Sequence, residues 1–236
     1  LARVRHNMPY FLASKATWNY DLSLNIPESV LSAFYSQYTQ SKTAQANLGP
    51  MANLLLTPYF GTTGGRVEIG PVPQWTAMYL ISQDERMKEV MLAHADAAGS
   101  VPVHYRDDSS NQPLDLDRYP NVSTWRGTSQ PALPAVVNGS TIWDPDTSHQ
   151  ASYAYVPYLV TGDAFFQEEM TYWAAWNLTA MSPGYREYGQ GLLWEDQVRG
   201  QAWSMRALGE ASRILPDSHV MKAYFRGRLA NSLEWF

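Results

Sequence analysis

The sequence predicts an all-α fold, built from αα-hairpins arranged in an inner and an outer layer. Three segments of the chain each carry an apolar stretch, a short polar break and a second stretch with helical periodicity. Each break contains an aspartate, at Asp84, Asp163 or Asp217. Apolar residues make up 45% of the 236 residues, which is enough for a sizeable core. Because a helix that is apolar on every side is normally buried, we expect the first helix of each pair inside and the second outside.

The first pair of helices is expected between Pro73 and Ser100. The apolar stretch from Trp75 to Ile81 ends at Ser82, and a second helix follows from Glu85. Ser82 and Glu85 have the spacing of a capping box for that second helix.

The second pair contains a proline in its first helix. The apolar stretch runs from Ala151 to Val160 and breaks at Thr161–Asp163. Pro157 removes one backbone hydrogen bond, so we expect a kink near Tyr153. The helix after the break carries an apolar face formed by Phe166, Met170 and Trp173.

The third pair covers the C-terminal end of the sequence. Its first helix is expected from Glu195 to Leu215, and its second after the break at Pro216–Asp217. The breaks of the three pairs are unevenly spaced, so the pairs do not form a strict sequence repeat.

The remaining segments give weaker patterns, and we interpret residues 1–236 as one helical-hairpin domain in which residues 1–64 are the less clear part. A helix is expected to start at Pro27. The stretch Gly49–Phe60 suggests a further short helix, and Arg66–Ile69 a short strand. Between Ser100 and Asp144 the chain is rich in Pro, Gly, Ser and Asn, which predicts a long loop. A loop of this length in a compact domain is usually functional or mobile.

Composition and the absence of common motifs exclude several classes of function. The net charge of −5 gives no electrostatic basis for nucleic-acid binding. Without cysteine, disulfides and thiolate metal sites are excluded. No apolar run reaches the ~18 residues of a membrane span. The sequence carries none of the patterns HExxH, GxSxG, GxGxxG or the phosphate-binding P-loop, and we expect no cofactor and no metal. The acidic stretch Asp107–Asp117 could hold calcium, but it departs from the EF-hand pattern and is better interpreted as a solvated loop.

Three motifs in order resemble the (α/α) toroids of the six-hairpin glycosidase-like superfamily. They are "IGPVPQW", "DTSHQASYAYVPYLVTGD" and "EDQVRGQAWSMRALGEA". The resemblance implies an all-α fold and carbohydrate-active chemistry, as a glycoside hydrolase or a polysaccharide lyase, with the substrate in the funnel where the inner helices begin. A full toroid has six hairpins, and this sequence shows three or four. The resemblance therefore implies a partial toroid, which another domain or a second subunit would complete.

Polar residues concentrate where the expected inner helices start, and we expect these starts to form one rim around a carbohydrate site. The candidate catalytic residues are Glu68, Asp144, His149, Glu195 and Asp196. The candidate substrate-binding residues are Arg66, Trp75, His104, Tyr105, Arg106, Trp143, Gln150 and Arg199. In this interpretation Trp75 and Trp143 stack on a sugar ring, and the loop that carries His104 folds over the rim.

Each of these patterns also has a purely structural interpretation. Thr147 and Gln150 match a capping box, and Asp146 could cap the same helix. His149 could simply be packed, and Arg199 could form an ordinary ion pair with Glu195 one turn away.

The residues of the rim leave the type of chemistry open. Hydrolysis of a glycoside generally needs two carboxyl groups. A lyase needs a base such as histidine or tyrosine, with arginine to neutralise the carboxylate of the sugar. The number of carboxylates at the rim favours a hydrolase, and a lyase or a non-catalytic carbohydrate-binding domain remains the alternative.

Overall fold

A computed structural model describes residues 3–44, 52–62, 64–124, 141–194 and 197–236. Within these residues the chain forms eight α-helices and a single two-stranded sheet, which confirms the all-α prediction. The helices are α1 (Met8–Ala13), α2 (Glu28–Ala44), α3 (Gln74–Ser82), α4 (Glu85–Ala98), α5 (Tyr155–Thr161), α6 (Ala164–Ala180), α7 (Val198–Ile214) and α8 (Lys222–Trp235). The sheet pairs β1 (Arg106–Asp107) with β2 (Gln112–Pro113), and the turns η1 (Thr147–His149) and η2 (Tyr188–Gln190) are 3₁₀-helical.

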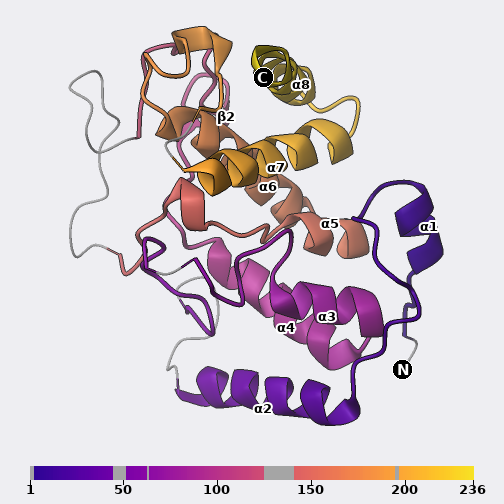
Figure 1. Ribbon diagram of the computed structural model, residues 1–236. Coiled ribbons are helices and arrows are strands. Elements are labelled where there is room, and N and C mark those ends of the chain that lie inside the picture. The colour runs from indigo at the N-terminus through magenta and orange to yellow at the C-terminus, as the bar shows by residue number, and fades with distance from the viewer. Residues whose placement is uncertain (1–2, 45–51, 63, 125–140, 195–196) are drawn as a thin grey trace.

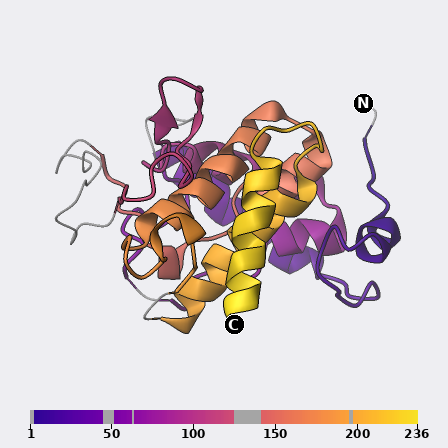
Figure 2. The same ribbon diagram turned by 90° about the horizontal axis from the view of Figure 1, so that it is seen from above.

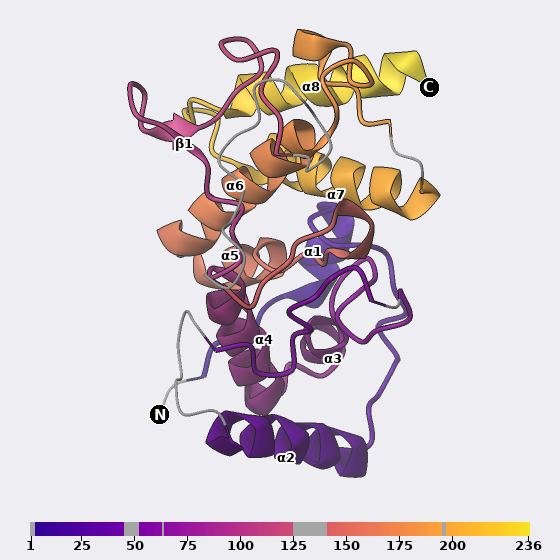
Figure 3. The same cartoon turned by 90° about the vertical axis from the view of Figure 1, so that its left-hand side faces the viewer.

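The helices after α1 lie above one another in nearly the order of the sequence. Figures 1 and 3 show α2 at one end, α3 and α4 next, α5 and α6 in the middle, and α7 and α8 at the other end. The helical pairs therefore form a stack along one direction. The closure of such pairs into a toroid, and the completion of that toroid by another domain or subunit, remain predictions.

The first helical pair has the expected order but a different cap. Asp84 is the N-cap of α4, and its side chain accepts a hydrogen bond from the backbone N–H of Arg86. Ser82 instead donates to the carbonyl of Met78 and accepts from the N–H of Asp84. The predicted capping box of Ser82 and Glu85 is therefore wrong, because the helix starts one residue after Asp84 and the aspartate is the better-placed acceptor.

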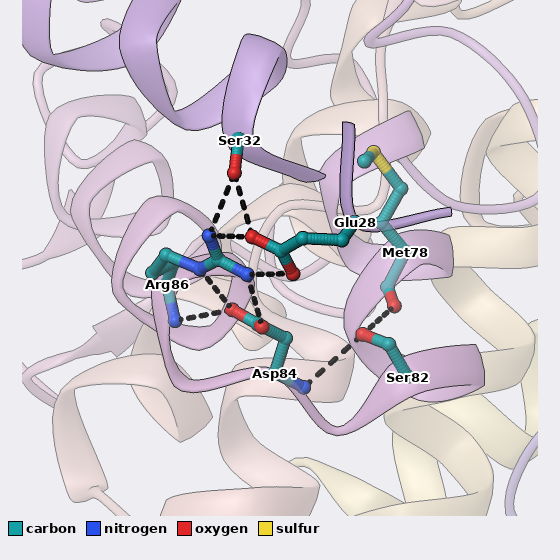
Figure 4. Close-up of polar contacts among 6 residues, drawn as sticks. All are labelled: Glu28, Ser32, Met78, Ser82, Asp84 and Arg86. Atoms are coloured by element: carbon teal, nitrogen blue, oxygen red, sulfur yellow. Dashed lines mark hydrogen bonds and ion pairs between the residues drawn. The ribbon is translucent and has the colours of Figure 1, made fainter. Parts of the chain in front are cut away.

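An arginine at the start of α4 fixes α2 against the first pair (Figure 4). Arg86 donates two hydrogen bonds to the carboxylate of Glu28 on α2, at 2.8 and 2.9 Å. It donates two more to Asp84, at 2.9 and 2.7 Å. One planar guanidinium thus joins the helix cap to the outermost helix, with two bonds to each carboxylate.

The second pair reverses the predicted order of burial. α6 buries 12 of its 17 residues, including Tyr172, Trp173 and Trp176, which point to several sides of the helix. It packs against α5, α7 and β2. The prediction of an outer helix relied on one apolar face and overlooked the aromatic and alanine residues on the others, so α6 is the central helix of the structure.

The proline of the second pair lies at a helix start. α5 begins at Tyr155, which places Pro157 in the first turn, where backbone N–H groups have no partner within the helix. The expected kink near Tyr153 is therefore wrong, since Tyr153 precedes the helix.

The third pair also differs in burial. Figure 2 shows α8, in yellow, lying across the helices beneath it, and α7 is its main contact. α7 buries only one face, which is made of small residues and leucine: Gly200, Ser204, Ala207, Leu208, Ala211 and Ser212. The prediction that this helix is apolar on nearly all sides is wrong, because its other faces carry polar and charged residues, but α7 buries more of its residues than α8, as expected for the inner helix of the pair.

Two of the weaker predictions for the N-terminal third are corrected. The helix expected from Pro27 is confirmed as α2. The described part of Gly49–Phe60 contains turns and no helix, and Arg66–Ile69 is a turn closed by the N–H of Ile69 on the carbonyl of Arg66, at 3.1 Å. The segment after α1 is held by the hydroxyl of Tyr20, which donates to the carbonyl of Leu80 at 2.9 Å.

Candidate functional site

Three of the segments predicted to form the rim meet in the structure. Arg66 donates from Nε to the carboxylate of Glu68 at 2.8 Å, and from a terminal nitrogen to the carbonyl of His149 at 3.3 Å. Arg199, at the start of α7, lies 2.6 Å from Nε2 of His149. We call Arg66, Glu68, Asp146, His149 and Arg199 the rim cluster.

The η1 turn presents the histidine of this cluster. Asp146 caps the turn by accepting from the N–H of Ser148 at 2.8 Å, which confirms its expected capping role. The other end of the turn is anchored by Gln150, which donates to the carbonyl of Thr147 at 2.9 Å. Asp146 and Gln150 therefore hold both ends of the three-residue turn that carries His149.

The two nitrogens of His149 have different partners, and these determine its tautomer. Nδ1 lies 2.6 Å from the carboxylate of Asp146. Because an ionised carboxylate only accepts hydrogen bonds, Nδ1 carries the proton. Since a guanidinium only donates, Nε2 must accept from Arg199. The ring is therefore a neutral imidazole whose lone pair is covered by an arginine.

The arginine at Nε2 is placed by a glycine. A Cβ built on Gly64 would lie 1.5 Å from a terminal nitrogen of Arg199, so the guanidinium lies against the bare backbone of Gly64. Arg199 also donates to the side-chain oxygen of Gln197 at 3.1 and 3.2 Å. Arg199 therefore has two side-chain acceptors among the described residues, Nε2 of His149 and the side-chain oxygen of Gln197.

Glu68 and Gln150 have structural roles in the described arrangement. Glu68 is 2% exposed and accepts from Arg66 and from the N–H of Thr57. Gln150 is fully buried and exchanges two hydrogen bonds with Asn177 of α6, at 2.5 and 2.9 Å. The expectation that Gln150 contacts substrate is therefore wrong, because α6 covers it.

Asp144 connects the rim to the preceding loop through its backbone. Its N–H donates to the carbonyl of Pro58 at 2.9 Å, and its carbonyl accepts from Phe60 at 3.1 Å. The side chain is half-buried. This bridge places residues 58–60 beside the start of the η1 segment.

The two tryptophans expected to stack on a sugar are buried. Trp75 is 1% exposed and stacks on His94, with ring centroids 4.2 Å apart. Trp143 is 2% exposed and meets Phe60 edge to face. The predicted stacking role of both is wrong, because neither ring has a face open to a ligand.

The loop with His104 lies on another side of the molecule. Nε2 of His104 is 2.7 Å from the carboxylate of Glu169, and Arg106 pairs with Glu168, so both residues are held by α6. Figure 3 shows β1 and the start of α7 at opposite sides of the view. The expectation that this loop, with His104, Tyr105 and Arg106, folds over the rim is therefore wrong. Glu195 and Asp196 lie outside the described residues.

A charged pair on α7 was missed by the sequence analysis. Glu210 accepts from the hydroxyl of Ser152 at 2.8 and 2.9 Å, and Arg206 lies one helical turn before it. Burial raises the pKa of the Glu210 carboxyl to about 7 and lowers the pKa of Arg206. The sequence signal was the i, i+4 spacing of an arginine and a glutamate on a helix expected to be apolar on all sides.

Exposed aromatic rings form a row close to the start of α7. Tyr185 and Trp194 have centroids 5.3 Å apart, and Trp194 and Trp235 are 5.9 Å apart. Trp194 is 49% exposed and Trp235 45%. These rings, rather than Trp75 and Trp143, present faces to solvent.

Comparison of the chain with known protein families, with curated proteins and with solved structures finds no match. The resemblance to six-hairpin glycosidase-like folds therefore remains a prediction from the three sequence motifs. Among the residues that the structure describes, no helix is both long and apolar enough to cross a membrane, and no three acidic or histidine side chains gather as a metal site would require. Within the acidic loop, Asp107 accepts from the N–H and hydroxyl of Ser109, both at 2.9 Å.

Proposed function

We propose that the chain is a carbohydrate-active domain that acts on an acidic poly- or oligosaccharide at the rim cluster. The observation that carries this proposal is the Asp146–His149–Arg199 chain, in which a histidine oriented by a carboxylate faces an arginine. The oriented histidine is a suitable base, and the arginine is a suitable partner for the carboxylate of a uronic acid.

The same groups favour elimination over hydrolysis. His149 Nε2 would remove the proton from the carbon next to the sugar carboxylate. The electron pair of that C–H bond would form a carbon–carbon double bond as the bond to the leaving oxygen breaks. The proton would then pass from His149 to the leaving oxygen, so the products are an unsaturated sugar and a free hydroxyl.

Arg199 would couple base activation to substrate binding. In the described structure its guanidinium covers the lone pair of Nε2. A uronate carboxylate would attract the guanidinium more strongly than a neutral imidazole, since charged acceptors form the stronger bonds. Arg199 would then leave Nε2, and the lone pair of Nε2 would be uncovered only when a substrate is present.

The exposed aromatic row gives the proposal a surface for a longer sugar chain. Trp194 precedes Arg199 by five residues, so the row continues from the start of α7. Aromatic faces stack on the apolar faces of sugar rings, and the row would hold units next to the one that reacts. Hydrolysis by two carboxylates is the second candidate; the carboxylates that the sequence offers for it are Glu68, Asp144, Glu195 and Asp196.

A polysaccharide panel tests the proposal. Polymers that contain uronic acid and neutral polymers are incubated with the protein, and both unsaturated-uronate absorbance and reducing ends are measured. We expect absorbance from acidic polymers only, and its loss in His149→Gln. Reducing ends without absorbance would support the hydrolase instead. Activity that persists in His149→Gln would rule out the rim cluster as the site.

A further inference from the structure

A second concave site lies away from the rim cluster, between the N-terminal segment and the last two helices. Its volume is about 650 Å³. One wall is the segment from Lys15 to Trp18, and the others come from Tyr155 of α5, from α7 and from α8. We call it the cationic groove. Its size is within the range of sites that take small ligands.

Positive charge gathers in this groove, although the whole chain carries a net charge of −5. Its lining contains Lys15, Arg206, Arg213 and Arg226. Glu210 is the one carboxylate among the lining residues. A concave surface with an excess of one charge concentrates ligands of the opposite charge.

The exposed cations of the groove retain donors for a ligand. Arg213 donates one hydrogen bond within the described residues, from a terminal nitrogen to the carbonyl of Ser14 at 2.7 Å. Arg226 gives a bond of 3.3 Å to the carbonyl of Ser212 and lies 3.9 Å from Asp217, and its side chain is 62% exposed. A guanidinium has five N–H donors, so most of them remain for other acceptors.

Buried polar atoms at the groove also lack acceptors or donors among the described residues. Thr17 is 6% exposed, and its hydroxyl has no described partner. A small cavity of about 10 Å³ shares Tyr155, Arg206 and Glu210 with the groove. The buried atoms without described partners in its lining are Tyr153 Oη, Trp173 Nε1 and Arg206 Nε. The small cavity has about the size of one water molecule, which can satisfy its atoms, whereas the hydroxyl of Thr17 favours a ligand that supplies a hydrogen-bond partner in the groove.

One wall of the groove is aromatic. Trp18 is 37% exposed and meets Tyr155 edge to face, with centroids 6.0 Å apart. The hydroxyl of Tyr155 donates to the carbonyl of Ala16 at 2.6 Å, which fixes the segment that carries Trp18. The indole therefore offers a positioned flat surface beside the cations.

We propose that the cationic groove binds an anionic small molecule, whose carboxylate or phosphate group is held by Lys15, Arg213 and Arg226 and whose body lies against Trp18. This site is separate from the rim cluster and does not depend on the proposed function. The shared chemistry is an oxyanion on a ligand with hydroxyl groups, which describes both acidic and phosphorylated sugars.

Two glycines give a matched pair of variants that separates blocking of the groove from loss of folding. Gly209 of α7 lines the groove, and Gly227 of α8 does not. A Cβ at either position meets nothing within 4 Å, so a side chain can start at both without meeting a neighbouring atom. Gly209→Leu places an apolar side chain in the groove, while Gly227→Leu makes the same chemical change outside it. Both changes remove a glycine from a helix, which favours folding.

Lys15 offers an independent test. It has φ 58°, in the left-handed region that favours glycine. Lys15→Gly therefore removes the charge while relieving the backbone, so we expect a more stable protein that binds anions more weakly. A purely structural role for Lys15 would not weaken binding.

Binding is measured by titration calorimetry with glucuronate, glucose 6-phosphate and inorganic phosphate, with glucose as the neutral control. We expect the two anionic sugars to bind, and glucose not to bind. Gly209→Leu and Lys15→Gly should each weaken binding by about tenfold or more, while Gly227→Leu leaves it unchanged. A preference between the two anionic sugars separates a carboxylate site from a phosphate site. The proposal is overturned if no anion binds, if glucose binds as well as glucuronate, or if Gly209→Leu binds like the wild type.

Discussion

The guanidinium of Arg199 lies 2.6 Å from Nε2 of His149, and Asp146 lies 2.6 Å from the other nitrogen of the same ring. Arg199 belongs to α7 and His149 to the η1 turn, which are 50 residues apart in the sequence. The contact therefore depends on the packing of η1 against α7 and not on local spacing. It gives His149 one defined tautomer and one defined position.

Replacement of Arg199 should affect turnover more than folding. Arg199→Lys keeps the positive charge but loses the planar fork that can hold a carboxylate with two bonds. We expect kcat/KM on a polymer of uronic acid to fall by about 10²-fold, which corresponds to roughly 3 kcal/mol of transition-state stabilisation. The melting temperature should change by only a few degrees. Steady-state kinetics and thermal unfolding measure the two effects.

Gly64→Ala is the matched control for that experiment, because it moves the arginine without changing it. A Cβ at Gly64 would overlap the guanidinium of Arg199, which must then leave His149. We expect a smaller loss of kcat/KM than in Arg199→Lys, since the displaced arginine can still reach the substrate. Equal activity of both variants and the wild type would show that the Arg199–His149 contact has no part in turnover.

The sequence analysis predicted the convergence of the rim more accurately than the function of its members. Polar residues at the helix starts near Arg66, His149 and Arg199 do meet. Trp75 and Gln150 were assigned to substrate because they flank these starts, yet both are buried. Helical periodicity indicates which face a residue occupies, but it does not indicate which neighbouring segment covers that face. The burial of Gln150 is an example. Its contact with Asn177 depends on the position of α6, which the sequence pattern does not give.

Acid should destabilise the protein through His94. The ring is buried, and burial lowers its pKa to about 4. Its Nδ1 is 2.7 Å from the carbonyl of Val90, and its Nε2 accepts from the N–H of Leu55, so the buried form is neutral. Because the unfolded chain takes up a proton near pH 6.5, the stability that depends on neutral His94 is present above that pH. It is lost as the pH falls from about 6.5 to 4, by on the order of 3 kcal/mol.

The slope of stability against pH tests this prediction. His94→Gln cannot take up the proton, so its free energy of unfolding should depend less on pH in this window than that of the wild type. His219→Gln removes a less buried histidine and should change the slope less. Urea unfolding at several pH values measures all three proteins. Identical slopes for His94→Gln and the wild type would contradict the buried neutral state.

Asp84 should contribute to stability in two ways, as the cap of α4 and as a partner of Arg86. Asp84→Ala removes the cap, which costs about 1 kcal/mol and lowers the melting temperature by roughly 2–4 °C. Glu28→Gln weakens only the α2 side of the same arginine, so its effect should be smaller. Asp108→Ala, in an exposed loop, is the neutral control. Circular dichroism during heating measures the melting temperatures of the three variants. A larger decrease in Glu28→Gln than in Asp84→Ala would show that the docking of α2 contributes more to stability than the cap.

The cationic groove could not be found from the sequence because its parts come from both ends of the chain. Lys15 and Arg226 are more than 200 residues apart, and each alone is an ordinary exposed cation. Glu210 resembles one half of a helical ion pair with Arg206. Its raised pKa depends on burial beside Ser152, which lies before α5 and is 58 residues away. Such burial becomes visible only once the segment before α5 lies against α7.

Glu210 should make anion binding and stability depend on pH. Burial raises the pKa of its carboxyl to about 7. The folded protein therefore holds this proton between about pH 4.5 and 7, where an ordinary carboxyl has lost it, and the associated stability is present at low pH and lost as the pH rises through 7. The groups around it are Ser152, Tyr155 and Arg206, with Lys15, Arg213 and Arg226 along the groove. Protonation of Glu210 thus removes the one negative charge among the residues that line the groove. Glucuronate should therefore bind more tightly at pH 5.5 than at pH 8.

The variant Glu210→Gln tests both effects. Its affinity for glucuronate should be the same at pH 5.5 and pH 8. The difference between its melting temperature and that of the wild type should be more positive at pH 8 than at pH 5.5. If the wild type and Glu210→Gln show the same pH dependence of binding, Glu210 does not control the charge of the groove.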